Sequence, residues 1–402
     1  MSIGLLAEFV PVDVVDAAVH HYGRQARRAG GKPPPAAVSY AVVGPALYAE
    51  EDYSEVTAKL SRVLTVLGCW DPRRPATASA PAQARVRLGA RVVGEVFHRV
   101  AQPLGGALVG GVIGRWRAVS LDGMVFDVPD GPENAEEFGY AGRGANRSAF
   151  PRVRAVTLVE CGTEAVIGAE LGPCVGEGAG ERTPARRMYG LPTSDPMLVC
   201  DAGFYGFDDW CAAADTGAAL LWRVGDTVGP PLVEMLPDGS HTSVVFAETV
   251  SSEQRADLLD RARAGRRPDP GEARVVRVVE YYVDGRGPDT GKELICLLTT
   301  ITDHRRASAG RLAEGYHPGW NHEGGNAQIK TGLRGPGKVL RSQSPELVKQ
   351  EVYGYFLAHY TLIGLAARAA AQAGPDIGGI SFAKTLRVAR RQIEDDPAAF
   401  PP

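Results

Sequence analysis

The spacing of apolar residues changes near Val119, and this change constrains the fold more than any other feature of the chain. Upstream, apolar residues recur at helical intervals; downstream, they mostly follow strand spacing. The segments that follow are strands at 119–128, 153–160 and 164–171, a short apolar strand at 197–200, a helix at 206–214 and a strand at 218–224. This order, β-β-β before β-α-β, predicts a mixed α/β sheet with helices packed on it.

The chain divides into five parts by apolar spacing, Pro-rich segments and charged loops. We predict a helical N-terminal domain at 1–82 that ends in a Pro/Ala/Ser-rich linker, and a helical connector at 83–118. The α/β core begins at 119–224, a β-rich insertion follows at 225–300, and helices return at 301–402. A length of 402 residues is enough for several such units.

Composition excludes several classes of protein. The chain is 44% hydrophobic and 23% charged, which are ordinary globular values and exclude a disordered, collagen-like or coiled-coil chain. Its 44 Lys and Arg residues face 47 Asp and Glu residues, so a uniformly basic coat for nucleic acid is excluded, while a local basic face is not.

Cysteine usage and hydropathy predict a cytoplasmic protein. The six cysteines form no Cys-x-x-Cys pair, which argues against a disulfide scaffold or a structural zinc site. The N-terminus lacks the basic and apolar regions of a signal peptide. The uncharged stretch 352–367 has 16 residues, fewer than the roughly 20 that span a bilayer, so we expect no membrane contact.

Three acidic residues lie at positions that suit a catalytic or metal-binding site. Asp122 follows an apolar strand and precedes Gly123, Asp201 ends the strand 197–200, and Glu323 lies in a His- and Trp-containing segment. Ligands bind where the backbone opens at strand ends. Carboxylates that converge need cations to neutralise them, as in a two-metal site for phosphoryl transfer.

Each of these acids could also have an ordinary structural role. Asp before Gly is common in turns, and Glu323 fits a solvated helix. Spacing alone does not bring the acids together, because 79 and 122 residues separate them. Tyr316, Glu323 and Lys330 are seven residues apart, however, and therefore share one face if this segment is a helix.

A basic tract surrounds these three residues. Between residues 303 and 349, eight Lys or Arg residues face four acids. Such a patch suits a polyphosphate backbone, although a solvated charged loop fits equally well. The basic side chains that follow Glu323 most closely are Lys330, Arg334, Lys338 and Arg341, and we name them as candidate DNA contacts.

The ordered motifs resemble those of the DDE transposases of the insertion-sequence-four family. The register of Tyr316, Glu323 and Lys330 matches the family signature of Tyr, Arg, Glu and Lys. The segments around Asp122 and Asp201 resemble the two aspartate blocks, and 236–240 resembles part of the insertion domain. The resemblance extends over nearly the whole chain.

The resemblance implies an RNase H-like catalytic core with an inserted β-rich subdomain and a helical N-terminal domain. Asp122, Asp201 and Glu323 would hold two Mg²⁺ or Mn²⁺ ions and catalyse cleavage and transfer of DNA strands at the ends of an insertion element. Tyr316 and Lys330 would contact phosphates of the terminal inverted repeats. The family also implies a homodimer on the DNA, associated with the nucleoid.

Two departures from the family pattern keep other functions open. Gly319 replaces the signature Arg, and Ala202 replaces an Arg that often follows the second Asp, so two fork-shaped phosphate donors are missing. An impaired or repurposed copy that only binds DNA is one alternative, and an RNase H-like nuclease without joining activity is another. Trp222 is a candidate for stacking on an extruded base, with a core position as its alternative.

Overall fold

The computed structural model describes residues 3–26, 33–52, 55–56, 59, 80–105, 111–176, 178–190, 195–284, 292–319, 322–374 and 377–395. The Pro/Ala/Ser-rich linker is predicted at 71–82, and its residues 71–79 lie outside this range. Helix α5 (Ala80–Leu88) begins at Ala80, so the last three residues of the predicted linker are helical instead.

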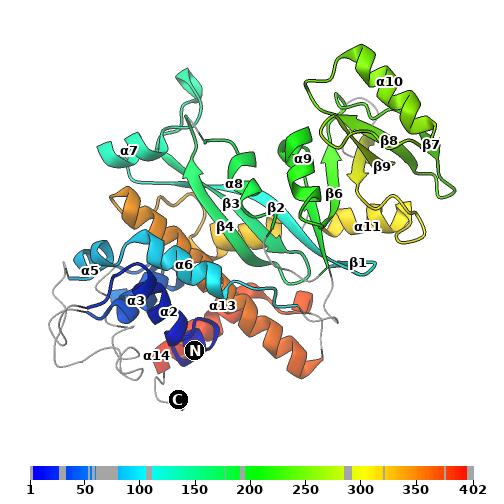
Figure 1. Ribbon diagram of the computed structural model, residues 1–402. Helices are drawn as coiled ribbons and strands as arrows, with labels where there is room; N and C mark the ends of the chain where they lie inside the picture. The colour runs from blue at the N-terminus through cyan, green and yellow to red at the C-terminus, as the bar shows by residue number, and fades with distance from the viewer. Residues whose placement is uncertain are drawn as a thin grey trace.

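A single mixed sheet forms the centre of the described chain (Figure 1). Its strands are β1 (Val112–Ile113), β2 (Trp116–Asp127), β3 (Arg152–Glu160), β4 (Ala165–Pro173), β5 (Pro196–Cys200), β6 (Ala219–Val224), β7 (Glu234–Met235), β8 (His241–Phe246), β9 (Ala273–Asp284) and β10 (Lys292–Thr299). The strand order is β4-β3-β2-β5-β6-β10-β9-β8-β7, with β1 paired to β2. Strands β2, β5 and β6 run parallel, and all other pairs are antiparallel.

Helices cover the sheet and build the N-terminal part. They are α1 (Ile3–Phe9), α2 (Val12–His21), α3 (Pro35–Leu47), α5, α6 (Ala90–Val100), α7 (Pro132–Phe138), α8 (Arg182–Arg186), α9 (Phe207–Ala214), α10 (Ser252–Arg263), α11 (Ala309–Gly319), α12 (His322–Ala327), α13 (Pro345–Ala373) and α14 (Phe382–Asp395). Short 3₁₀ turns lie at η1 (Gly144–Asn146), η2 (Ala202–Phe204) and η4 (Ile377–Gly379), and a π-helical turn, η3 (Gln328–Leu333), follows α12.

Alternation along the central strands produces two apolar faces. On β5, Met197 and Val199 join a cluster beneath α11, whereas Leu198 and Cys200 join the larger cluster on the other side. Side chains of a strand alternate between the faces, so a continuously apolar strand is buried on both. This explains why 197–200 has no polar residue before Asp201.

The long helix α13 connects the N-terminal helices to the sheet. It begins after Ser344 with Pro345 in the first turn and ends at Ala373; Gly374, which caps it, has a φ of 82°, the left-handed conformation that closes helices. Helices α3, α6 and α14 and strand β4 pack against it. The uncharged stretch 352–367 is therefore a core helix, and none of the helices that the structure describes is long and apolar enough to cross a membrane.

The predicted insertion extends the core sheet instead of forming a separate one. Strand β10 pairs with β6, and β9, β8 and β7 continue outward from it, with α10 over them at the upper right of Figure 1. Backbone hydrogen bonds therefore run without interruption from the core into 225–300. The five domain boundaries given above stay predictions.

Candidate active site

The first two acids end up side by side at one edge of the parallel strands. Ser120 of β2 pairs with Val199 of β5, and Asp122 and Asp201 each stand two residues further along. Residues in register on parallel neighbours point to the same face, and such strands are about 4.8 Å apart. The fold thus brings together two carboxylates that are 79 residues apart.

Each of the two carboxylates is fixed by a backbone amide. Gly123 N donates to Asp122 Oδ1 at 2.7 Å, and Gly203 N donates to Asp201 Oδ1 at 2.8 Å. Asp201 is exposed and caps η2, while Asp122 is half-buried. Backbone donors of this kind hold a carboxylate in one orientation.

Glu323 lies on α12, and its side chain is outside the described part of the structure. The backbone of α12 is placed by Asn326, one turn after Glu323. Asn326 Nδ2 donates to Asp122 Oδ2 at 2.6 Å, so the helix that carries the third acid is tied to the first. Sequence reasoning missed Asn326, although its spacing of three from Glu323 puts it on the same helical side.

A glycine pair seats α12 on the turn between β3 and β4. A Cβ at Gly325 would lie 2.7 Å from the carbonyl oxygen of Glu164, and a Cβ at Gly324 would overlap the Glu164 carboxylate. Gln328 Nε2 then donates to Glu164 Oε2 at 2.5 Å. Gly324 and Gly325 lower the helix propensity of the segment, but they allow this close approach.

The donor set suits a hard divalent cation. Asp122 and Asp201 supply carboxylate oxygens, which Mg²⁺ and Mn²⁺ prefer. A carboxylate oxygen has two lone pairs, so Asp122 keeps acceptor sites beside its two hydrogen bonds. Among the side chains that the structure describes, which do not include Glu323, no three His, Cys, Asp or Glu residues are grouped to hold a metal ion.

Glu181 is a further acid near the site that the sequence did not single out. It lies against Gly123, on the opposite face of β2 from Asp122, and pairs with Arg154 of β3. Burial raises the pKa of Glu181, Arg154 opposes the rise, and the charges of Asp201 and Asp122 add to it. Glu181 and Arg154 therefore form an ion pair on the face of β2 opposite to Asp122.

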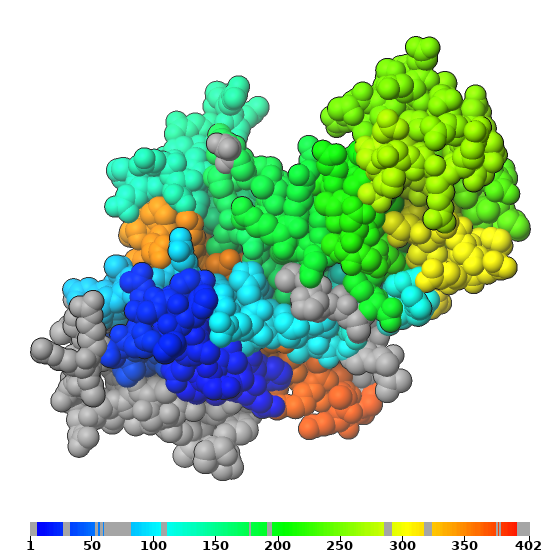
Figure 2. Space-filling view, in the orientation of Figure 1, coloured from blue at the N-terminus to red at the C-terminus, as the bar shows by residue number. Residues whose placement is uncertain are grey.

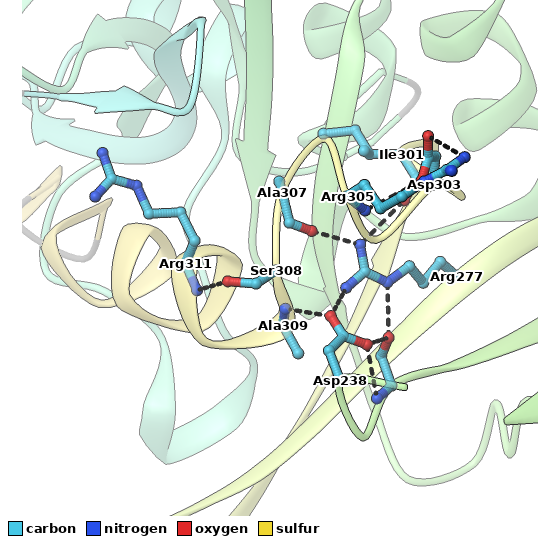
Figure 3. Close-up of polar contacts among 10 residues, drawn as sticks. Asp238, Arg277, Ile301, Asp303, Arg305, Ala307, Ser308, Ala309 and Arg311 are labelled. Atoms are coloured by element: carbon cyan, nitrogen blue, oxygen red, sulfur yellow. Dashed lines mark hydrogen bonds and ion pairs between the residues drawn. The ribbon is translucent and has the colours of Figure 1, made fainter. Parts of the chain in front are cut away.

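Helix α11, which carries Tyr316, starts at a buried ion pair from the insertion (Figure 3). Arg277 of β9 is wholly buried; it donates to Asp238 and to the carbonyls of Ile301 and Ala307. Asp238 Oδ2 also accepts the amide of Ala309, the first residue of α11, at 2.7 Å. The turn at 236–240 thereby caps α11 from outside the helix.

Tyr316 is buried beneath the sheet, with 2% of its surface exposed, in the cluster that contains Leu312 and Leu221. Trp222 is fully buried and packs edge-on against Trp210, with ring centroids 5.6 Å apart. The core alternative for Trp222 therefore describes this conformation, and the expectation of an exposed stacking surface is corrected. Contact of either residue with DNA stays a prediction.

The basic tract after Glu323 is largely used within the protein. Arg334 is 9% exposed, with its guanidinium 5.3 Å from the centroid of the Phe126 ring. Lys338 pairs with Glu50. Arg341 donates to carbonyls at the end of α3, those of Tyr48, Ala49 and Glu51.

These contacts show that three of the four candidate DNA contacts also have partners within the protein. Lys330, on the π-helical turn η3, is half-exposed. The role of all four basic residues in DNA binding stays a prediction.

The surface of the described chain is hollowed on the side seen in Figure 2. Figure 2 shows the hollow between the blue-green part around α7 and the yellow-green insertion, and the green segments with α8 and α9 form its floor. Asp201 directly precedes η2 and α9. Arg143 and Arg147, both exposed, lie in the loop that projects after α7.

Comparison with known proteins places the chain among transposases. Residues 1–98 match the family model of the insertion element 4 transposase N-terminal domain. The transposase InsG for insertion sequence element IS4 of Escherichia coli K12 is 26% identical over 333 residues, which cover 81% of this chain and 69% of InsG. The putative transposase InsZ of the same strain is 34% identical over 148 residues, or 36% of this chain and 48% of InsZ.

The fold agrees with a solved transposase. The piggyBac transposase in its synaptic complex with hairpin DNA superposes with a TM-score of 0.50 over 97% of this chain and 79% of that chain, at 10% identity. This likeness confirms the predicted mixed α/β, RNase H-like fold. The N-terminal match and the similarity to InsG confirm the resemblance of this chain to IS4 transposases.

Proposed function

We propose that this transposase cuts DNA strands at the ends of its insertion element and joins the freed ends to target DNA, with Asp122, Asp201 and Glu323 as the catalytic acids. The observation that carries the proposal is the register of parallel strands β2 and β5, in which Asp122 and Asp201 each lie two residues beyond the paired Ser120 and Val199. The tie between Asp122 and α12 supports the inclusion of Glu323.

The three acids would hold two Mg²⁺ or Mn²⁺ ions, which supply an activated water and stabilise the attacking and leaving oxygens of phosphoryl transfer. The chain itself fixes where these oxygens lie. Backbone amides orient Asp122 and Asp201, and Asp201 is exposed, so a DNA strand can reach it.

The partner in this proposal is duplex DNA with terminal inverted repeats, bound by two copies of the chain because two ends must be paired. Arg143 and Arg147, which are exposed, and Lys330, which is half-exposed, are cations that suit its phosphates. Molar mass measured with and without end DNA tests the dimer: a complex of two chains with two DNA ends is expected, and a complex of a single chain with a single end would contradict it.

The decisive experiment measures cleavage and end binding separately. Asp122→Asn, Asp201→Asn and Glu323→Gln are each expected to abolish nicking of inverted-repeat DNA in Mg²⁺ or Mn²⁺ while binding of the ends persists. Asp257→Asn on α10, whose side chain is 71% exposed, serves as the matched control and keeps full activity. Full activity in any of the three site variants refutes the assignment.

A protein that only binds DNA is the second candidate, and Gly319 and Ala202 favour it because both positions lack a guanidinium. Under this alternative the wild-type chain binds repeat ends with a steep salt dependence and cuts them in no metal. Gly319→Arg discriminates: cleavage that appears with the Arg indicates an impaired enzyme. A strand-joining assay with pre-cut ends tests the third alternative, a nuclease that cuts without joining.

A further inference from the structure

Three polar side chains from three elements form one chain of hydrogen bonds at Asp122. Asp122 on β2 and Thr157 on β3 are directly opposite in the antiparallel register, so both point to the face that α12 covers. Asn326 of α12 lies over them. Its Nδ2 donates to Asp122 Oδ2 at 2.6 Å, and its Oδ1 accepts from Thr157 Oγ1 at 3.2 Å.

Asn326 is buried for this contact, not for packing alone. It is 2% exposed, and a buried amide is costly unless its donors and acceptors are used. Thr157 Oγ1 also lies 3.3 Å from the carbonyl oxygen of Asp122, so the hydroxyl bridges the strand and the amide. Because the ionised Asp122 carboxylate only accepts hydrogen bonds, Asn326 presents its NH₂ group to Asp122, and its Oδ1 is left to accept from Thr157.

The two donors, Gly123 N and Asn326 Nδ2, together fix the orientation of the Asp122 carboxylate. Gly123 N holds Oδ1 at 2.7 Å and Asn326 Nδ2 holds Oδ2, so rotation about the last side-chain bond is blocked. Each oxygen keeps one lone pair for a cation. Outer partners of this kind orient carboxylate ligands, and their loss typically costs about 10–100-fold in metal affinity or activity.

The same amide also sets the place of the helix. The turn at Glu164 contacts α12 at Gly324 and Gly325. Because glycine has no side chain, neither residue makes a side-chain contact with β2. Asn326, the next residue, makes the side-chain contact with β2 through its hydrogen bond to Asp122. Glu323 lies one turn before Asn326 on the same helix.

We infer that Asn326 is a positioning residue of the transposase: it orients the Asp122 carboxylate for a divalent cation and holds α12, with Glu323, against β2. Thr157 supports this orientation by its contact with the oxygen of the Asn326 amide. This inference rests on the proposed function, because it treats Asp122 as a metal ligand.

The test measures Mn²⁺ binding by the full-length protein without DNA, together with cleavage as a function of metal concentration. Asn326→Ala is expected to weaken Mn²⁺ binding about 10–100-fold and to shift the metal dependence of cleavage by a similar factor. Binding of repeat ends without metal stays unchanged. The control is Asn134→Ala, which removes a fully buried amide that donates to the Pro129 carbonyl outside the site. It is expected to lower thermal stability without changing Mn²⁺ affinity.

Thr157 supplies the second pair of variants. Thr157→Val removes the hydroxyl at similar volume and is expected to weaken Mn²⁺ binding, whereas Thr157→Ser keeps the hydroxyl and restores it. This pair also decides the matter if Asn326→Ala fails to fold: Mn²⁺ affinity at the wild-type value in both Thr157 variants overturns the inference.

Asp122→Asn separates the two levels of the argument. If it leaves Mn²⁺ affinity unchanged, the proposed metal site itself is wrong. If it weakens binding while Asn326→Ala binds and cleaves like the wild type, the proposed function stands and the positioning role of Asn326 is refuted.

Discussion

Asp238 Oδ2 lies 2.5 Å from Nη2 of Arg277, whose side chain is wholly inaccessible to solvent. This pair joins the turn between β7 and β8 to β9, and through Ala309 to the start of α11. The hydrogen bonds from Ser240, Ala309 and Arg277 outweigh the effect of burial and lower the pKa of Asp238, so the carboxylate stays charged. The insertion and the helix that bears Tyr316 are thus held by one buried charge pair.

Removing Asp238 leaves the buried Arg277 without its ion-pair partner. Asp238→Ala is expected to lower the free energy of unfolding by about 3–5 kcal/mol, because an uncompensated guanidinium remains in the core. Urea denaturation measures the change. Asp284→Ala breaks the solvent-exposed pair of Asp284 with Lys292 and is expected to change stability by less than about 0.5 kcal/mol. Equal losses in the two variants would contradict the structural role of Asp238.

Stability is expected to fall in mild acid because of His359 on α13. Burial lowers the pKa of His359 to about 3, compared with about 6.5 for an unfolded chain. Between these values the unfolded chain binds a proton that the folded chain does not, so the folded state loses stability as the pH falls. The loss from pH 7 to pH 5 amounts to about 2 kcal/mol.

Replacement of His359 isolates this contribution. In His359→Gln the difference in unfolding free energy between pH 7 and pH 5 is expected to shrink by that amount, whereas His21→Gln, at an exposed position, leaves the difference unchanged. An identical pH dependence in wild type and His359→Gln would show that His359 titrates normally in the folded protein.

The glycine pair of α12 is expected to respond unequally to alanine. Gly325→Ala meets the backbone of Glu164, which has a φ of 63°, while Gly324→Ala meets only its side chain, which is able to turn away. We expect Gly325→Ala to cost about 1–3 kcal/mol and to reduce cleavage more than Gly324→Ala does. Gly310→Ala in α11 has open space around its Cβ and should stabilise the protein by about 0.5–1 kcal/mol. A harmless Gly325→Ala would mean that α12 is not seated on this turn.

Arg341 is expected to act in stability and not in DNA affinity. Its guanidinium closes the carbonyl end of α3, where cations are favourable. Arg341→Ala should lower the melting temperature, and Arg341→Lys should fail to restore it because an ammonium group lacks the fork geometry. Lys330→Ala is the complementary variant and should weaken binding of repeat ends without a change in melting temperature. If Arg341→Ala instead weakens binding of repeat ends without a change in melting temperature, Arg341 acts in DNA binding.

Several features of the site were readable along the chain. The apolar run 197–200 predicts a strand buried on both faces that ends at Asp201, and the structure places β5 there. The motif register identified the family, which the N-terminal match and InsG confirm. The stretch 225–300 was correctly expected to be rich in strands, but its union with the core sheet through β6 and β10 was not foreseen.

The sequence alone determined what depends on local spacing: the strand and helix periods, the two faces of each strand, and the acids at their ends. Tertiary structure decided which polar groups meet. Asp122 and Asn326 are 204 residues apart, and Arg341 reaches α3 across about three-quarters of the chain. Such contacts arise only when whole layers pack, because the same basic or amide side chain suits solvent, DNA or a buried carbonyl equally well until its neighbours are in place.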